Sequence, residues 1–163
     1  MPRSIHRPGH VALRRGRISL PGQVYLVTFT TQTRRPLFAP FWTGAVASAA
    51  MGDARIWRDS RLLAWVLMPD HWHGLVELGS HDSLDRVMQR LKANSARRVR
   101  REAGVSCRVW ARGYHDHGLR QEEGVREAAR YVVGNPLRAG LVARVADYPF
   151  WDAVWVKGDG PPL

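Results

Sequence analysis

The stretch LLAWVLMPDHWHGLVEL, residues 62–78, constrains the fold more than any other part of the chain. Two runs rich in aliphatic and aromatic residues flank Pro69-Asp70, a dipeptide typical of a tight turn. We therefore expect two antiparallel strands, over residues 62–68 and 71–78, joined in a hairpin. An antiparallel sheet is then the central element that the rest of the chain must complete.

The remaining segments alternate between strand and helix patterns. The expected elements are, in order, a strand over 23–31, a helix within 41–58, the two hairpin strands, a helix over 83–103, a strand within 108–119 and a helix over 122–134. This order is close to the ferredoxin-like (RRM-like) pattern of α+β proteins. It predicts a single antiparallel sheet with its helices packed on one face.

The length of 163 residues suits one domain. Residues 1–20 carry five arginines and no acid, and they predict a basic N-terminal arm before a single domain over residues 21–163. The one cysteine, Cys107, excludes an internal disulfide, and the first residues lack the apolar core of a secretory signal. The longest apolar stretch is too short to cross a bilayer, so we expect a cytoplasmic protein without a membrane partner.

A strong positive charge points to nucleic acid as the partner. Lysine and arginine number 25 against 14 acidic residues, which leaves a net charge of +11, and only Lys92 and Lys157 are lysines. Arginine forms forked contacts with phosphate and stacks on bases, which favours a nucleic-acid partner. Codon bias toward GC is the alternative explanation, and charge alone does not identify a reaction.

Two pairs of histidines have the spacing of a metal site. On a strand, residues two apart point to the same face, so His71 and His73 would project together. The same holds for His115 and His117, and the residues alone do not decide between the pairs. Tyr131 and Asn135 lie four apart on the last expected helix and hence on one side of it. A helical tyrosine is more often part of the core than a nucleophile.

Three segments in order, YLVTFTTQTRRPLF, WVLMPDHWHGLV and YVVGNPLRAGLV, resemble the REP-associated tyrosine transposases, bacterial relatives of the single-tyrosine HUH (IS200-like) transposases. The resemblance covers roughly residues 20–150. It implies that His71 and His73 are the metal-binding HUH pair on a central strand, and that Tyr131 is the nucleophile. It also implies Asn135 as a third metal ligand, Mg²⁺ or Mn²⁺ as the metal, and a neighbouring or structural role for His115 and His117.

The function implied is a metal-dependent single-strand DNA endonuclease or transposase. It would cleave and rejoin hairpin (REP-like) DNA through a 5′-phosphotyrosine, as a monomer or homodimer with single-stranded or hairpin DNA as its partner. Two alternatives stay open: a non-catalytic single-stranded nucleic-acid-binding domain of ferredoxin-like fold, and a metallohydrolase that uses a metal-bound water.

Basic residues in three segments are candidates for DNA contacts. They lie in the loop after the first strand, along the 83–103 helix and beside Asn135: Arg34, Arg35, Arg86, Arg90, Lys92, Arg97, Arg98, Arg101 and Arg138. The alternative for each helix residue is an ordinary solvated surface position.

Overall fold

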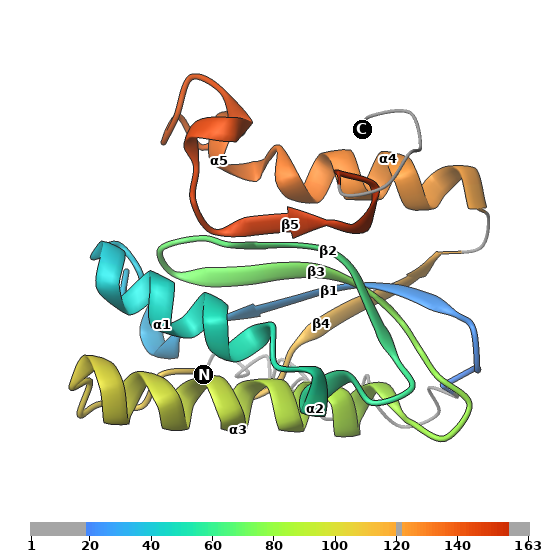
Figure 1. The fold of residues 1–163 in the computed structure, drawn as a ribbon, viewed down its shortest axis with the longest axis horizontal. Helices are drawn as coiled ribbons and strands as arrows, with labels where there is room; N and C mark the ends of the chain where they lie inside the picture. The colour runs from blue at the N-terminus through green and yellow to red at the C-terminus, as the bar shows by residue number, and fades with distance from the viewer. Residues whose placement is uncertain (1–18, 120–121, 157–163) are drawn as a thin grey trace, which may run out of the picture.

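A five-stranded antiparallel sheet forms the centre of the protein (Figure 1). The computed structural model describes residues 19–119 and 122–156, so the expected N-terminal arm over residues 1–20 lies almost wholly outside the described residues. The strands are β1 (Val24–Thr30), β2 (Arg61–Leu67), β3 (His71–Glu77), β4 (His115–Leu119) and β5 (Trp151–Ala153). Their order in the sheet is β4-β1-β3-β2-β5, which places β3 at the centre. The α+β antiparallel fold and the hairpin are confirmed.

One face of the sheet is covered by three helices, α1 (Phe41–Met51), α2 (Ala54–Trp57) and α3 (Leu84–Ala103) (Figure 1). Their shared core is built around Phe29, whose ring stacks on Trp72 at 5.0 Å and meets Trp110 edge-on at 4.7 Å. The α3 helix has the expected ends, because the Ser83 hydroxyl accepts a hydrogen bond from the Arg86 amide and Gly104 adopts a left-handed φ of 68°.

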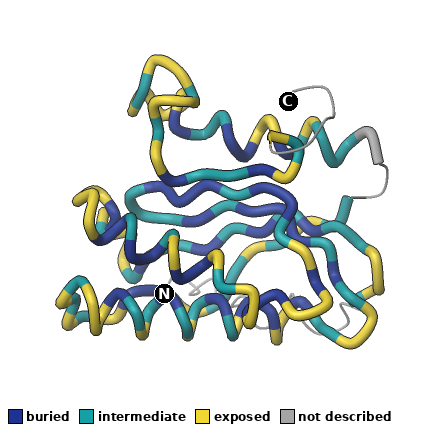
Figure 2. Tube along the Cα trace, viewed as in Figure 1, coloured by how far each residue is buried: buried dark blue, intermediate teal, exposed yellow. Residues whose placement is uncertain are grey.

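The other face is covered by α4 (Glu122–Val133), followed by α5 (Asn135–Arg138), so the expectation that all helices share one face needs correction (Figure 1). The reason lies in the strands, which are apolar on both sides. Leu75 and Val76 are adjacent on β3 and point to opposite faces, yet both have 0% exposure. A sheet with two apolar faces must be covered twice, and Figure 2 shows the central strands buried between the layers.

The chain returns to the sheet after α5, as expected for the tail. β5 pairs with β2, and the Tyr148 hydroxyl donates a hydrogen bond of 2.7 Å to the carbonyl oxygen of Leu67. Three short 3₁₀ turns complete the described elements, at Gln32–Arg34, Val145–Asp147 and Val154–Val156. No helix within residues 19–119 and 122–156 is both long and apolar enough to span a membrane.

Candidate active site

Two imidazoles from the central strand lie side by side on the face covered by α4. His71 and His73 are two residues apart on β3, and their ring centroids are 4.7 Å apart at an interplanar angle of 89°. The β3–β1 register places Thr28 opposite His73 and Leu26 opposite Leu75, and Leu75 packs in the α4-side core. The expected shared face of the histidine pair is therefore confirmed.

Each imidazole is held through the same ring nitrogen. Nδ1 of His71 lies 2.6 Å from Oδ1 of Asp70, and Nδ1 of His73 lies 2.6 Å from Oγ1 of Thr28. Both contacts leave Nε2 as the nitrogen that can bind a metal ion. Carboxylate or hydroxyl partners on Nδ1 are the usual means by which proteins orient metal-binding histidines.

The electrostatics also keep His73 neutral, the form that binds metal. Burial lowers the pKa of His73 to about 4, and the electrostatic effects of the neighbouring His71 and Arg138 side chains lower it further. Burial raises the pKa of Asp70, but its contacts with His71 and Arg34 outweigh burial and hold that pKa below its usual value. At neutral pH the site therefore presents a neutral His73 beside an ionised Asp70.

Tyr131 lies near the end of α4, and the residue is 53% exposed. The Arg138 guanidinium lies over its ring, 4.1 Å from the centroid, and Nη2 of Arg138 donates a hydrogen bond of 2.5 Å to the Tyr131 carbonyl oxygen. Arg138 is also close enough to His73 to lower its pKa. Arg138 thus links the tyrosine to the histidine pair, and an exposed phenol on this face is not a core side chain.

Asn135 begins α5, directly after a break in the helix at Gly134. The break was expected from Asn135-Pro136, but Gly134 keeps a helical φ of −77° and its amide donates to the Arg130 carbonyl oxygen at 2.9 Å. The chain therefore continues in a nearly helical path, which keeps Asn135 one turn after Tyr131. A Cβ at position 134 would lie 2.9 Å from that carbonyl oxygen, so this turn requires a glycine.

Within residues 19–119 and 122–156, no further acid, cysteine or histidine joins the histidine pair as a third ligand. Among the residues that the structure describes, no three side chains of these types come close enough to bind a metal ion together. The second pair, His115 and His117, lies on β4 on the same face, and the register puts Thr28 between His115 and His73. The sheet thus makes them neighbours of the His71–His73 pair, separated from it by β1.

The candidate DNA-binding residues fall on two different faces. Arg34 and Arg138 lie near the histidine pair, and Arg35 follows Arg34 in the same exposed loop. The candidates on α3 lie across the sheet, on the face that α1 and α2 also cover (Figure 1). The expected positive track along α3 is therefore not part of the surface around Tyr131.

Two of the α3 residues make internal contacts. Arg90 pairs with the buried carboxylate of Asp82, and its Nε donates to the Ile56 carbonyl oxygen. Lys92 donates two hydrogen bonds of 2.7 Å to the carbonyl oxygens of Ala111 and Gly113. These bonds fix α3 to neighbouring segments, and a DNA-binding role for Arg90 and Lys92 stays a prediction.

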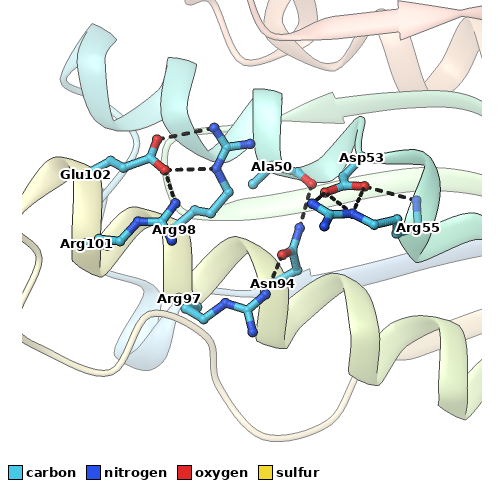
Figure 3. Close-up of polar contacts among 8 residues, drawn as sticks. All are labelled: Ala50, Asp53, Arg55, Asn94, Arg97, Arg98, Arg101 and Glu102. Carbon is cyan, nitrogen blue, oxygen red and sulfur yellow. Dashed lines mark hydrogen bonds and ion pairs between the residues drawn. The ribbon is translucent and has the colours of Figure 1, made fainter.

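A groove of about 310 Å³ between α2 and α3 is lined by Arg90 and Arg97 of α3. Figure 3 shows Arg97 bonded to the amide of Asn94, and Arg98 and Arg101 paired with Glu102. In the same view Arg55 is paired with Asp53. Arg97 is the arginine in this view whose hydrogen-bond partner carries no charge.

Two residues that hold the histidines, Thr28 and Asp70, were missed in the sequence. Asp70 was interpreted only as a turn residue and Thr28 only as a strand residue. The sequence signal for the role of Asp70 was its position directly before His71. Thr28 is 45 residues from His73 in the chain, so its role depends on the strand register.

Residues 21–134 match the sequence profile of the family described as "Transposase IS200 like". A REP-associated tyrosine transposase of Escherichia coli (strain K12) is 27% identical in an alignment that covers 57% of this chain and 54% of that protein. A protein of unassigned function from Haemophilus influenzae is 23% identical, with 47% and 54% covered. The chain spans about half the length of these curated relatives.

Solved structures show the same fold. A REP-associated tyrosine transposase bound to a REP hairpin has a TM-score of 0.63 and 22% identity, with 83% of this chain and 79% of that chain covered. A proposed transposase from Deinococcus radiodurans has a TM-score of 0.52 and 18% identity, with 73% and 95% covered.

Proposed function

The chain belongs to the IS200-like transposase family, and from this we propose that it is a metal-dependent single-strand DNA endonuclease or transposase that cleaves and rejoins hairpin DNA. The observation that carries the proposal is the pair of Nδ1-anchored imidazoles, His71 and His73, on the face covered by the helix of Tyr131. A structural neighbour bound to a REP hairpin supports hairpin DNA as the substrate class.

The residues present fit a divalent metal ion. His71 and His73 would hold it through Nε2, and the amide oxygen of Asn135 is the candidate third ligand, one turn after Tyr131. Two nitrogens and an oxygen suit Mn²⁺ better than Mg²⁺, which prefers oxygen ligands, and the sequence resemblance implies one of these two ions. When bound, such an ion supplies Lewis-acid polarisation of the scissile phosphate.

Tyr131 is the proposed nucleophile. Its Oη attacks phosphorus in line, the Oη–P bond forms as the P–O3′ bond breaks, and the phenolic proton leaves as the released 3′-oxygen becomes a hydroxyl. The product is a 5′-phosphotyrosine. The released 3′-hydroxyl can attack it and reverse the step, or the 3′-hydroxyl of another DNA end can attack it and join the two strands. Arg138, stacked on the ring, places positive charge beside the reacting phosphate.

The proposed DNA contacts follow the two faces of the molecule. Near the site, the loop of Arg34 and Arg35 and the stacked Arg138 lie where a cleaved strand would pass. Across the sheet, four of the exposed or half-buried arginines of α3 are proposed to bind a more distant part of the DNA: Arg86, Arg97, Arg98 and Arg101.

Replacing the nucleophile tests the proposal directly. In Tyr131→Phe the covalent protein–DNA adduct should disappear from a denaturing gel, while binding of the labelled hairpin survives, because only the phenolic oxygen is lost. Tyr114→Phe is the matched control, since its hydroxyl donates to Asp85 on α3, across the sheet from the site, and its adduct should persist. An adduct in the Tyr131→Phe protein would overturn the assignment.

Chelation separates the remaining alternatives. EDTA should abolish nicking while salt-sensitive DNA binding remains, because the proposed metal acts on the phosphate and not on the distant arginines. Indifference of every activity to EDTA would favour the non-catalytic binding domain. Cleavage without any covalent adduct would favour a metallohydrolase.

A further inference from the structure

We propose that Asp70 and Arg34 are positioning residues for His71, and that they couple a DNA-facing loop to the orientation of this metal-binding imidazole. The inference rests on the proposed function, because it assigns His71 to a metal ion. It adds a chain of three side chains, Arg34–Asp70–His71, to the two histidines and the tyrosine.

The first link fixes which nitrogen of His71 carries the proton. Oδ1 of Asp70 lies 2.6 Å from Nδ1 of His71, and an ionised carboxylate can only accept a hydrogen bond. Nδ1 must therefore be the donor, and a neutral ring then has its lone pair on Nε2. Asp70 thus selects the tautomer that can bind metal through Nε2 and fixes the plane of the ring.

The second link fixes Asp70 itself. Its other carboxylate oxygen, Oδ2, accepts a hydrogen bond of 3.1 Å from Nε of Arg34. Its backbone carbonyl oxygen accepts a further hydrogen bond of 2.9 Å from the Thr31 amide. The loop that follows β1 therefore fixes both the carboxylate and the backbone of Asp70. A shift of this loop would move Asp70 and, with it, the ring of His71.

The loop has an unusual backbone that supports a specific role for Arg34. Thr33 and Arg34 are consecutive non-glycine residues with φ of 55° and 54°. Residues with a Cβ rarely adopt this left-handed backbone conformation, so contacts with surrounding residues must stabilise it. The Arg34–Asp70 ion pair is one such contact, and Thr31 supplies another through a 2.7 Å bond from its hydroxyl to the Arg35 carbonyl oxygen.

Arg34 can contact Asp70 and a phosphate at the same time. Its bond to Asp70 uses Nε, and the side chain is 62% exposed. Within the described residues its two terminal nitrogens make no hydrogen bond, and these nitrogens form the outer edge of the guanidinium fork. A DNA phosphate on this edge would stabilise the loop conformation that orients Asp70 and, through it, His71.

Metal affinity measures the first link. With Mn²⁺ as the probe in isothermal titration calorimetry of the whole chain, Asp70→Ala should weaken binding about 10–100-fold. Asp70→Asn should weaken it less, because the amide oxygen can still accept from Nδ1. Asp59→Asn is the matched control: it alters another Asp–His pair, with 3.3 Å between Oδ2 of Asp59 and Nδ1 of His81, and should leave Mn²⁺ affinity unchanged.

The tautomer can be read without metal. In ¹⁵N spectra of the metal-free protein, His71 should carry its proton on Nδ1, and Asp70→Ala should shift it toward the Nε2–H form that a free imidazole favours in water. A purely structural role for Asp70 would not produce this shift. An unchanged tautomer in Asp70→Ala, or an Nε2 proton in the wild type, overturns the proposal.

The second link is tested by two neighbouring arginines. Arg34→Ala should lower Mn²⁺ affinity severalfold, whereas Arg35→Ala, in the same exposed loop, should leave it unchanged even if both variants weaken DNA binding. Equal Mn²⁺ affinities in the two variants overturn the coupling. His71→Ala keeps the two proposals apart. If His71→Ala binds Mn²⁺ as well as the wild type does, the proposed metal site fails. If His71→Ala loses Mn²⁺ binding while Asp70→Ala and Arg34→Ala keep it, only the proposed roles of Asp70 and Arg34 are refuted.

Discussion

Thr28 contacts Nδ1 of His73, as Asp70 contacts Nδ1 of His71. Its Oγ1 lies 2.6 Å from Nδ1 of His73 across the β1–β3 pair, and burial keeps that imidazole neutral. A hydroxyl can accept or donate, so this contact orients the ring but selects its tautomer less strictly than a carboxylate does. The two imidazoles are thus anchored by partners of different chemistry.

Thr28→Val should weaken Mn²⁺ binding about tenfold, because valine keeps the shape of threonine but cannot bond to Nδ1. The loss of one hydrogen bond should lower the free energy of unfolding by about 1 kcal/mol. Calorimetry with Mn²⁺ and urea unfolding would measure the two effects. Thr30→Val is the matched control, since Thr30 lies opposite His71 on the same face of β1, and it should keep full affinity. Equal affinities in all three proteins would contradict an orienting role for Thr28.

The histidine pair was visible in the sequence, whereas its supports were not. Alternation on a strand depends only on neighbouring residues, so His71 and His73 could be placed on one face from their spacing. Thr28 supports His73 through strand register, which is set by the whole sheet. A single sequence contains no direct signal for that register.

At the level of elements, the sequence predicted types and order better than packing. The hairpin, the α3 helix with its Ser83 and Gly104 ends, and the helix of Tyr131 are all present. The prediction that α4 packs on the same face as the other helices was wrong, because periodicity identifies the apolar stripe of a helix but not the surface that it packs against. β5 was expected only as a packed tail, since three residues are too few for a strand pattern.

The tail also contains a titratable anchor. Burial raises the pKa of Tyr148 to about 12, and its hydroxyl donates to the Leu67 carbonyl oxygen on β2. Because the folded state disfavours the phenolate, Tyr148 contributes stability that is fully present below the unfolded pKa of about 10. That contribution is lost as the pH rises from about 10 to about 12.

Tyr148→Phe should therefore be less stable than the wild type at pH 8, by about 1 kcal/mol for the lost hydrogen bond. It should lose less stability than the wild type between pH 8 and pH 11, because it has no buried phenol to ionise. Urea unfolding of both proteins at the two pH values measures the difference. Parallel losses in both proteins would show that Tyr148 does not ionise on unfolding in this range.

On the scale of the whole molecule, the sheet separates two basic surfaces. Arg34 and Arg138 lie with the histidine pair and Tyr131, whereas the α3 arginines lie across the sheet (Figure 1). The net charge of +11 predicted a nucleic-acid partner but not this division. A DNA segment that reaches both surfaces must pass around an edge of the sheet, which a folded hairpin with a single-stranded extension can do.

The arginines of α3 should then contribute to the affinity for DNA, and Arg97 is the residue that tests this contribution best. Its guanidinium is exposed and bonds to the uncharged Asn94, so its charge is not neutralised locally (Figure 3). Arg97→Gln should weaken binding of hairpin DNA, and the slope of log K against log salt should become less steep by about 1, as expected for one lost phosphate contact. Arg144→Gln changes the net charge equally, but Arg144 is paired with Asp147 at 2.7 Å on the tail, and its salt slope should match the wild type. Binding curves at several salt concentrations measure both variants. If the two slopes fall equally, the charge acts through the molecule as a whole and the α3 surface is not a DNA contact.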